Sequence, residues 1–412
     1  MTKFCRLLLS KYFITRPFHA EVFVLLQFLG LILLTSILLI GLYLLALEIQ
    51  YRDRPGNKLV ATVGQWHLQA QAPNHYRLVG EMELINRTAK LEIMVPQIRA
   101  EVKLLSEGSL RGVTTQTHVV SHHPDETARP DNYWFAYIVK VGKRTTIEVQ
   151  IDIHGADLSQ LKTAWVQVHY LTYGPQGRIP KTRHVVVPFQ FPDAAESKNW
   201  RSTPTADVLP IRTHLLTELD SPVEVVRRYV SPHAKSGDVV TIGESPIAIM
   251  QGRFRDPQDI QPGWAAKRLC YLFLPTSSLA TACGLQALID QSGTVRVLAA
   301  FLVGAIAKVF GKPGVFYQLA GEQARLIDDV TGTLPPYDQF IVLGPEHPQQ
   351  VVDLIQQETG LSAAIVDVND LGAVKVLAAT SNVAIPMLQK ALKKNPAGNA
   401  DEQTPVVLIR PL

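Results

Sequence analysis

The stretch AIVDVNDLGAVKV, residues 364–376, places three oxygen-bearing side chains directly after an apolar run. The run covers Ala363 to Val366, and Asp367, Asn369 and Asp370 follow it. Carboxylate and amide oxygens at the end of a buried strand can hold Mg²⁺ or Mn²⁺, which prefer oxygen ligands. The same residue types also end ordinary strands, where they accept hydrogen bonds from loop amides. These residues alone leave both interpretations open.

Other chemical signatures are missing from the sequence. It contains no GxxxxGK[ST] loop, no GxGxxG after a strand, no GxSxG elbow and no HExxH helix. The three cysteines, Cys5, Cys270 and Cys283, form no CxxC pair, which argues against a disulfide framework or a structural zinc. The cluster His122-His123-Pro124-Asp125 lies between predicted strands, and we expect it to be an exposed loop.

The overall charge excludes one class of partner. The chain has 412 residues, 40 Lys and Arg against 36 Asp and Glu, and a formal net charge of +4. No basic stripe interleaved with aromatic residues is present, so we expect no nucleic-acid partner. The length predicts two globular units once a membrane segment is set aside. The oligomeric state is left open.

An uncharged apolar run of 26 residues, 22–47, lies near the N-terminus. A helix of this length, at about 1.5 Å per residue, exceeds the hydrocarbon core of about 30 Å. Because a signal-peptide core has only about 7–15 residues, we expect an uncleaved single-pass anchor over residues 21–49, after a basic tail over residues 1–20. Four basic residues precede the run and three follow it closely, so the positive-inside rule does not choose an orientation.

The next part of the chain, residues 50–192, predicts an antiparallel β-sandwich of the immunoglobulin-like kind. Apolar residues alternate with polar ones over residues 91–104 and again over 147–153. Period-two alternation is typical of strands with one buried face. Glycine and asparagine separate the runs at the spacing found in sandwiches.

A polar stretch over residues 193–204 predicts a linker, and residues 205–412 predict a mixed α/β (α+β) domain. Helices are expected over Pro222–Val230 and over Pro348–Glu358, the second ended by Gly360. Strands are expected to begin at Val239 and at Ala363. Within residues 295–320 the apolar core, Val297 to Ala307, has only about 11 residues and is too short to span a membrane, so it predicts a buried or interfacial helix, with Lys308 and Lys312 beside it.

Several blocks between Leu209 and Val383 resemble a known family. They are LPIRTHLLTELDSPVEVV, SGDVVTIGESPIAIMQGRF, GVFYQLAGEQARLIDDVTGTLPPYDQFIVLGPEHP and IVDVNDLG. In this order they resemble the coenzyme F420-0:γ-glutamyl ligase family, and most closely an uncharacterised branch of it. The resemblance implies a ligase-like domain and GTP-dependent addition of glutamate to a deazaflavin cofactor.

The resemblance also implies site residues. The metal ligands it implies for Mg²⁺ or Mn²⁺ are Asp328, Asp367, Asn369 and Asp370. The nucleotide-binding residues it implies are Glu244, Gly252 and Arg253. The family's Ser-Lys pair in this loop corresponds to Ala248 and Ile249, which carry no group for a phosphate.

Two functions therefore stand side by side. The first is a membrane-anchored, metal- and GTP-dependent acid–amino-acid ligase. The second is a non-catalytic or repurposed ligase-fold protein that binds a small-molecule ligand or a partner. Because nucleotide-dependent ligation belongs to the cytoplasm, the resemblance implies that the globular domains are cytoplasmic.

Overall fold

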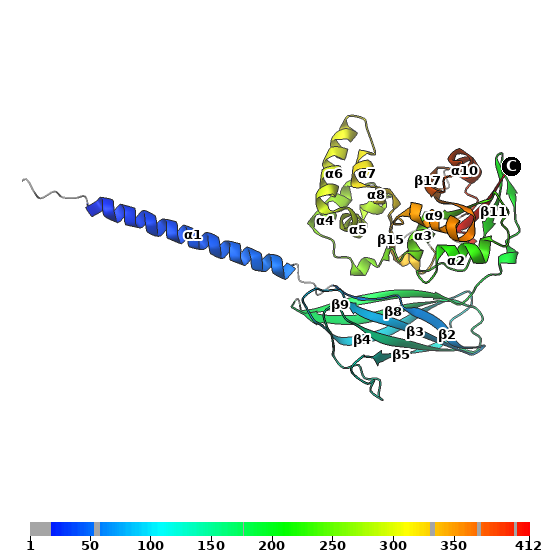
Figure 1. Cartoon of the computed structure of the whole chain (residues 1–412), viewed down its shortest axis with the longest axis horizontal. Helices are drawn as coiled ribbons and strands as arrows, with labels where there is room; N and C mark the ends of the chain where they lie inside the picture. Colours follow the sequence, from blue (N-terminus) through cyan, green and yellow to red (C-terminus); the bar gives the residue numbers. More distant parts are fainter. Residues whose placement is uncertain (1–17, 53–57, 176, 330–333, 369–371, 399–401) are drawn as a thin grey trace, which may run out of the picture.

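The computed structural model describes residues 18–52, 58–175, 177–329, 334–368, 372–398 and 402–412. These residues form a long N-terminal helix, a β-sandwich and a second domain of sheets and helices (Figure 1). Two of the predicted metal ligands, Asn369 and Asp370, lie outside the described residues, as does most of the predicted basic tail.

The N-terminal helix α1 (Phe18–Arg52) contains the whole predicted anchor segment. Its stretch Phe23–Tyr51 is long and apolar enough to cross a membrane, and no part of that stretch is buried against the rest of the chain. A helix that is apolar on all sides and exposed in water is unfavourable. A signal sequence near the N-terminus would meet the same criteria of length and composition. These criteria therefore establish an apolar helix but do not show whether it spans a membrane.

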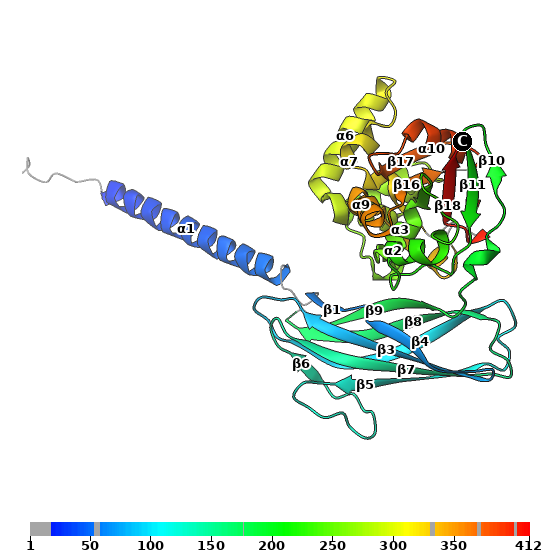
Figure 2. The same ribbon diagram turned by 45° about the vertical axis from the view of Figure 1, so that its right-hand side comes forward.

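The first domain consists of two antiparallel sheets packed face to face (Figures 1 and 2). The first sheet contains β1 (Leu59–Ala61), β2 (Gln65–Ala72), β3 (His75–Asn86), β7 (Arg144–His154) and β5 (Thr114–His122). The second has the order β6 (Tyr137–Val139), β4 (Ile93–Ser106), β8 (Leu161–Gly174) and β9 (Gly177–Pro188). The strands predicted from alternation at residues 91–104 and 147–153 correspond to β4 and β7.

Alternation explains why these strands pack as they do. In β7, Ile147, Val149, Ile151 and Ile153 are fully buried and face the opposite sheet. The intervening residues face outward, as the period of two requires. β4 pairs with β8 along most of its length, with two irregularities, between Met94 and Gln97 and between Leu105 and Ser106.

The second domain is built on a six-stranded sheet. Its order is β10 (Arg201–Ser202), β11 (Ala206–Ile211), β18 (Val406–Pro411), β12 (Val239–Gly243), β16 (Ser362–Val368) and β17 (Val374–Ala379). Only the pairing of β12 with β16 is parallel. Residues 193–204, predicted to be a linker, contain β10 and the short helix η2 (Ala194–Glu196), and β10 forms one edge of this sheet.

Helices cover both faces of this sheet. One face carries α2 (Pro222–Val225), the π-helical turn η3 (Val226–Val230), α3 (Glu244–Met250) and α9 (Pro348–Thr359), and the other carries α10 (Ile385–Leu392). The helix predicted over 222–230 thus continues from α2 into a wider π-turn. The helix predicted over 348–358 is α9, and Gly360 ends it with a φ of 74°, which favours glycine.

A small sheet and a helical subdomain complete the second domain. The sheet has the order β13 (Phe254–Arg255), β15 (Ile341–Val342) and β14 (Asp328–Asp329). The helices are α4 (Trp264–Leu269), α5 (Ala282–Ser292), α6 (Thr294–Val309), α7 (Val315–Ala320) and α8 (Gln323–Leu326). Short 3-10 turns connect these elements, namely η4 (Pro257–Asp259), η5 (Cys270–Leu272), η6 (Ser278–Ala280) and η7 (Tyr337–Gln339).

A separate apolar core lies between the two domains and contains side chains from both. Trp165 of β8 and Val186 of β9 pack with Ile249 of α3 and with Phe340 and Val342 near β15. All of these side chains are buried. The outer face of the sheet formed by β8 and β9 therefore supports the second domain, and both views show these two strands directly beneath it (Figures 1 and 2).

Candidate functional site

Three carboxylates lie near one another at the carboxyl ends of β12 and β16, two inner strands of the six-stranded sheet. Gly243, the last residue of β12, pairs in parallel with Val366 of β16. The next residues, Glu244 at the start of α3 and Asp367 near the end of β16, therefore lie at the same carboxyl end of the two strands. Asp328 opens β14 and lies close enough to interact electrostatically with both. Ligands commonly bind beyond the carboxyl ends of parallel strands, where these residues lie.

Burial raises the pKa values of all three carboxylates. Burial, followed by the charges of Asp367 and Asp328, raises the pKa of Glu244 to about 9. Burial likewise raises the pKa of Asp328, with a smaller contribution from Asp367, and burial raises the pKa of Asp367. A site that holds three such groups close together favours either protonation or a bound cation.

Two neighbouring side chains moderate this repulsion. Ser245 donates a hydrogen bond from Oγ to Oδ2 of Asp328, at 3.2 Å. Lys375 of β17 pairs with Asp367 across the sheet, and its charge lowers the pKa of both Asp367 and Glu244. One buried atom, Oε2 of Glu244, has no hydrogen-bond partner among the residues that the structure describes. An unpaired buried polar group is costly, and a proton, a water molecule or a cation can supply the missing partner.

These residues offer the oxygen ligands that a hard divalent cation takes, although the carboxylate oxygens of Glu244, Asp328 and Asp367 do not all lie within 4.8 Å of one another. All the principal donors are oxygens, and the unpartnered Oε2 of Glu244 is available as a ligand atom. Mg²⁺ and Mn²⁺ take such ligands, usually one or two carboxylates together with water and phosphate oxygens. The sequence-predicted metal residues Asp328 and Asp367 are thus brought together, and Glu244, predicted to bind the nucleotide, joins them.

A pocket of about 480 Å³ opens beside Asp328. Its polar lining consists of Thr276, Ser277, Ser278, Tyr317, Arg325 and Asp328. Hydroxyl groups and a guanidinium are donors for an anionic ligand such as a phosphate. The pocket contributes the room that a ligand of the carboxylate site would need.

The rest of the predicted nucleotide loop lies elsewhere. Arg253 donates from Nε to the carbonyl oxygen of Gly344 at 2.6 Å and forms an ion pair with Glu346. Its guanidinium is therefore occupied by the protein. Ala248 and Ile249 are buried in the core shared with the sandwich. The structure does not bring Gly252 and Arg253 together with the three carboxylates as a phosphate cradle.

The prediction that His122-His123-Pro124-Asp125 forms an exposed loop is wrong for His123, which is buried. Its ring stacks on Tyr137 at a centroid distance of 3.7 Å, and Nδ1 lies 2.7 Å from Oγ1 of Thr145. Burial lowers the pKa of His123 to about 4. His122 remains exposed, so the two rings point apart and form no metal site together.

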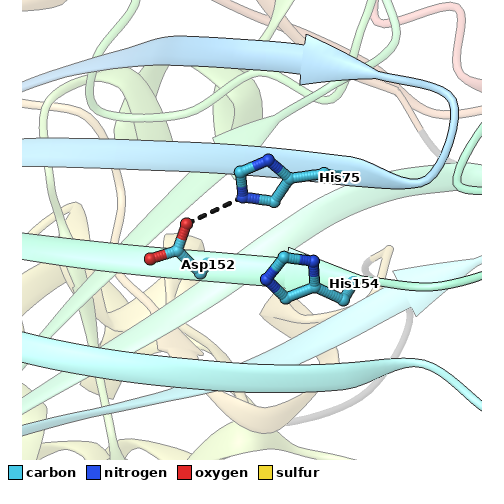
Figure 3. A group of neighbouring side chains, drawn as sticks. All are labelled: His75, Asp152 and His154. Atoms are coloured by element: carbon cyan, nitrogen blue, oxygen red, sulfur yellow. Dashed lines mark hydrogen bonds and ion pairs between the residues drawn. The ribbon is translucent and has the colours of Figure 1, made fainter.

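Another group of side chains in the sandwich, not predicted from the sequence, consists of His75, Asp152 and His154 (Figure 3). Nε2 of His75 lies 2.8 Å from Oδ1 of Asp152, and Arg77 donates to both oxygens of that carboxylate. The two imidazoles stack, with 5° between their planes. Ring-nitrogen lone pairs lie in the ring planes, so stacked rings do not both aim at one ion. Only the spacing of Asp152 and His154 along one strand could have indicated the group.

Comparisons with known proteins bear on the sandwich. Two antiparallel sheets packed face to face define it as an Ig-like domain. Residues 60–191 match the family model described as the N-terminal Ig-like domain of F420-0:gamma-glutamyl ligase. No curated protein matches the chain.

Two solved structures are also similar to part of the chain. The GAE domain of yeast GGA1 is 13% identical, with 30% of this chain and 88% of that one covered and a TM-score of 0.17. A family 123 glycoside hydrolase from Clostridium perfringens is 8% identical, with 34% of this chain and 29% of that one covered and a TM-score of 0.18.

Proposed function

We propose that this chain is a membrane-anchored, divergent relative of the F420-0:γ-glutamyl ligases whose second domain binds Mg²⁺ or Mn²⁺. The observation that carries the proposal is the electrostatic coupling of Glu244, Asp328 and Asp367 at the carboxyl ends of β12 and β16, with Oε2 of Glu244 unpartnered among the described residues. The match of the sandwich to the ligase family's Ig-like domain supports a ligase-related origin.

Amide ligation of glutamate to a small cofactor at this site would need a phosphoryl donor that activates the carboxylate and leaves as phosphate, and that donor would have to bind outside the buried loop at Ala248 and Ile249. When bound, the cation would neutralise phosphate oxygens. Glu244 would lose its proton as the cation binds, and Ser245 would orient the carboxylate of Asp328. Arg325 and the hydroxyl groups in the adjacent pocket would hold an anionic part of the substrate.

GTP does not fit the loop that the family resemblance assigned to it. Ala248 and Ile249 are apolar and buried, and the guanidinium of Arg253 is already bound to Gly344 and Glu346. We therefore expect GTP to bind weakly or not at all. Calorimetry that gives a dissociation constant in the low micromolar range would contradict this expectation.

The poor fit of GTP to this loop favours a second candidate function. The domain would bind a cation and an anionic ligand without ligating them, as a repurposed member of the fold. Asp328 and Asp367 would keep their role as ligands, and the buried loop around Ala248 and Ile249 would serve the contact with the sandwich.

Helix α1 would anchor either kind of protein in a membrane. Ligation that consumes a nucleotide would require the globular domains to face the cytoplasm. Protease protection of the C-terminal region in intact cells would test this, and accessible domains on the outside would exclude nucleotide-dependent ligation.

The cation site is tested by thermal unfolding of the detergent-solubilised full chain. We expect Mn²⁺ to raise the melting temperature of the wild type and to leave Asp367→Asn unchanged. Asp353→Asn, at an exposed position on α9, is the matched control and should respond like the wild type. An unchanged melting temperature of the wild type at millimolar Mn²⁺ would contradict the proposed cation site. Mass spectrometry would detect glutamyl transfer to a deazaflavin. A rise in melting temperature with Mn²⁺ but without such transfer would favour the second candidate.

A further inference from the structure

Helix α6 is apolar on two opposite sides. Its inner side, which includes Val297 and Ala300, is buried in the core of the helical subdomain. Its outer side carries a stripe of exposed apolar residues at helical spacing, which we call the outer stripe: Val295, Ala299, Leu302, Ile306 and Val309. A soluble surface helix normally shows polar residues on that side. The outer stripe therefore indicates a contact with an apolar phase or partner.

The exposure of these side chains is large. Leu302 is 63% exposed, Ile306 60% and Val309 85%, and Phe310 directly after the helix is 78% exposed. The stripe is about 21 Å long at about 1.5 Å per residue, too short to cross a hydrocarbon core of about 30 Å. The preceding helix α5 cannot extend it, because the two axes differ by 113°. A helix of this kind can lie along a surface.

The charges around the stripe identify the partner's chemistry. Between residues 260 and 321 the chain has five basic residues, Lys267, Arg268, Arg296, Lys308 and Lys312, and one acidic residue, Asp290. That aspartate is already paired with Arg255. Lysines at the end of an apolar stripe, beside an exposed aromatic ring, are typical of helices in the headgroup layer of anionic membranes.

The position of α6 agrees with this chemistry. Only five residues, 53–57, separate α1 from the sandwich, a reach of less than about 20 Å. In both views α6 lies on the side of the body from which α1 leaves (Figures 1 and 2). The tether to α1 thus keeps a bilayer on the side of the body where α6 lies, which raises the effective concentration of lipid there.

We propose that the outer stripe of α6 lies in the headgroup layer of the membrane that α1 enters. This second contact rests on the proposed anchor. It would fix the helical subdomain at the bilayer surface, and with it the pocket beside Asp328, which α7 and α8 help to line. A ligand reaching that pocket would then arrive along the membrane surface.

Photocrosslinking of the full chain in nanodiscs of phosphatidylcholine and phosphatidylglycerol tests the proposal. Benzoylphenylalanine is placed at Phe310, at Leu38 in the middle of α1, and at the exposed Tyr133 of the sandwich as the control. We expect lipid adducts at positions 310 and 38 and none at 133. Adducts at 38 without any at 310, or a protein adduct at 310, would overturn the surface contact alone. Missing lipid adducts at both would overturn the anchor as well.

A double variant supplies an independent measurement. Leu302→Ser with Ile306→Ser removes two exposed side chains, so the melting temperature in detergent should remain that of the wild type. The lipid adduct at position 310 should fall roughly tenfold, because the apolar area that enters the headgroup layer is lost. Omitting phosphatidylglycerol should lower the same adduct in the wild type. An unchanged adduct in the double variant would contradict the proposal.

Discussion

Arg183 of the sandwich donates from Nη2 to both carboxylate oxygens of Glu218 in the second domain, at 2.7 Å each. The Glu218 side chain is only 7% exposed. Burial raises its pKa, and the charge of Arg183 and the hydrogen bonds from it act in the opposite direction. This ion pair lies beside the apolar core that joins the domains, so polar and apolar contacts act together there.

Removing Arg183 should loosen the interface. Arg183→Met leaves the carboxylate of Glu218 buried without its cation, and we expect a loss of about 3–5 kcal/mol in the free energy of unfolding. Arg129→Met is the matched control, because Arg129 pairs with Asp131 at the surface and should change stability by less than about 1 kcal/mol. Chemical denaturation measures both, and equal losses would show that the buried pair has no special role.

Position 252 should require glycine, because the carboxylate of Glu218 lies against it. The φ of Gly252 is +68°, and a Cβ placed there would lie 2.6 Å from Oε2 of Glu218. Gly237 also has a positive φ, +90°, but no atom lies near its Cβ position. We therefore expect Gly252→Ala to cost more than Gly237→Ala, in which backbone strain of about 1 kcal/mol acts alone. Equal costs in thermal unfolding would remove the steric argument.

The interface should also weaken in acid. Burial lowers the pKa of His184 to about 4, although Asp256 acts in the opposite direction. The unfolded chain binds this proton near pH 6.5, so the stabilisation from neutral His184 is present above about pH 6.5 and is lost as the pH falls toward 4. We expect His184→Gln to lose less stability than the wild type over this range. His118→Gln, at an exposed position, should follow the wild type.

Glu244 should show the opposite pH dependence without metal. Its pKa is raised to about 9, whereas the unfolded chain releases that proton near pH 4.5. Stability of the metal-free protein should fall as the pH rises between these values, by at most about 1.4 kcal/mol per pH unit. Glu244→Gln should therefore gain stability over the wild type at pH 8 and little at pH 5. Mn²⁺ binding to the wild type should release protons, which calorimetry in buffers of different ionisation enthalpy detects.

Local patterns predicted local structure well in this chain. Alternation over residues 147–153 predicted β7, and Pro348 with Gly360 predicted both ends of α9. The reason is that strand period, proline at a helix start and glycine at a helix end act within a few residues. The π-turn over Val226–Val230 was not predicted, because its apolar spacing is the same as that of an α-helix.

Contacts between distant residues could not be read from the sequence. Ala248 and Ile249 looked like lost phosphate contacts, and their burial against Trp165 depends on how two domains pack. His123 looked like part of an exposed loop because its stacking partner Tyr137 lies on another strand. The pairing of Gly243 with Val366, which brings Glu244 to Asp367, follows only from the parallel register of two strands far apart in the chain.

The order of strands in the six-stranded sheet has a consequence for synthesis. β18 lies between β11 and β12, yet it is made almost 200 residues after β11. While the ribosome is still translating, β11 and β12 have no neighbour to join them, and their edges are open to wrong pairings. The sandwich, whose strands end at Pro188, can fold long before. We therefore expect nascent chains to carry a folded first domain beside an incompletely folded second domain. Contacts with chaperones should end once residues 406–411 have left the ribosome.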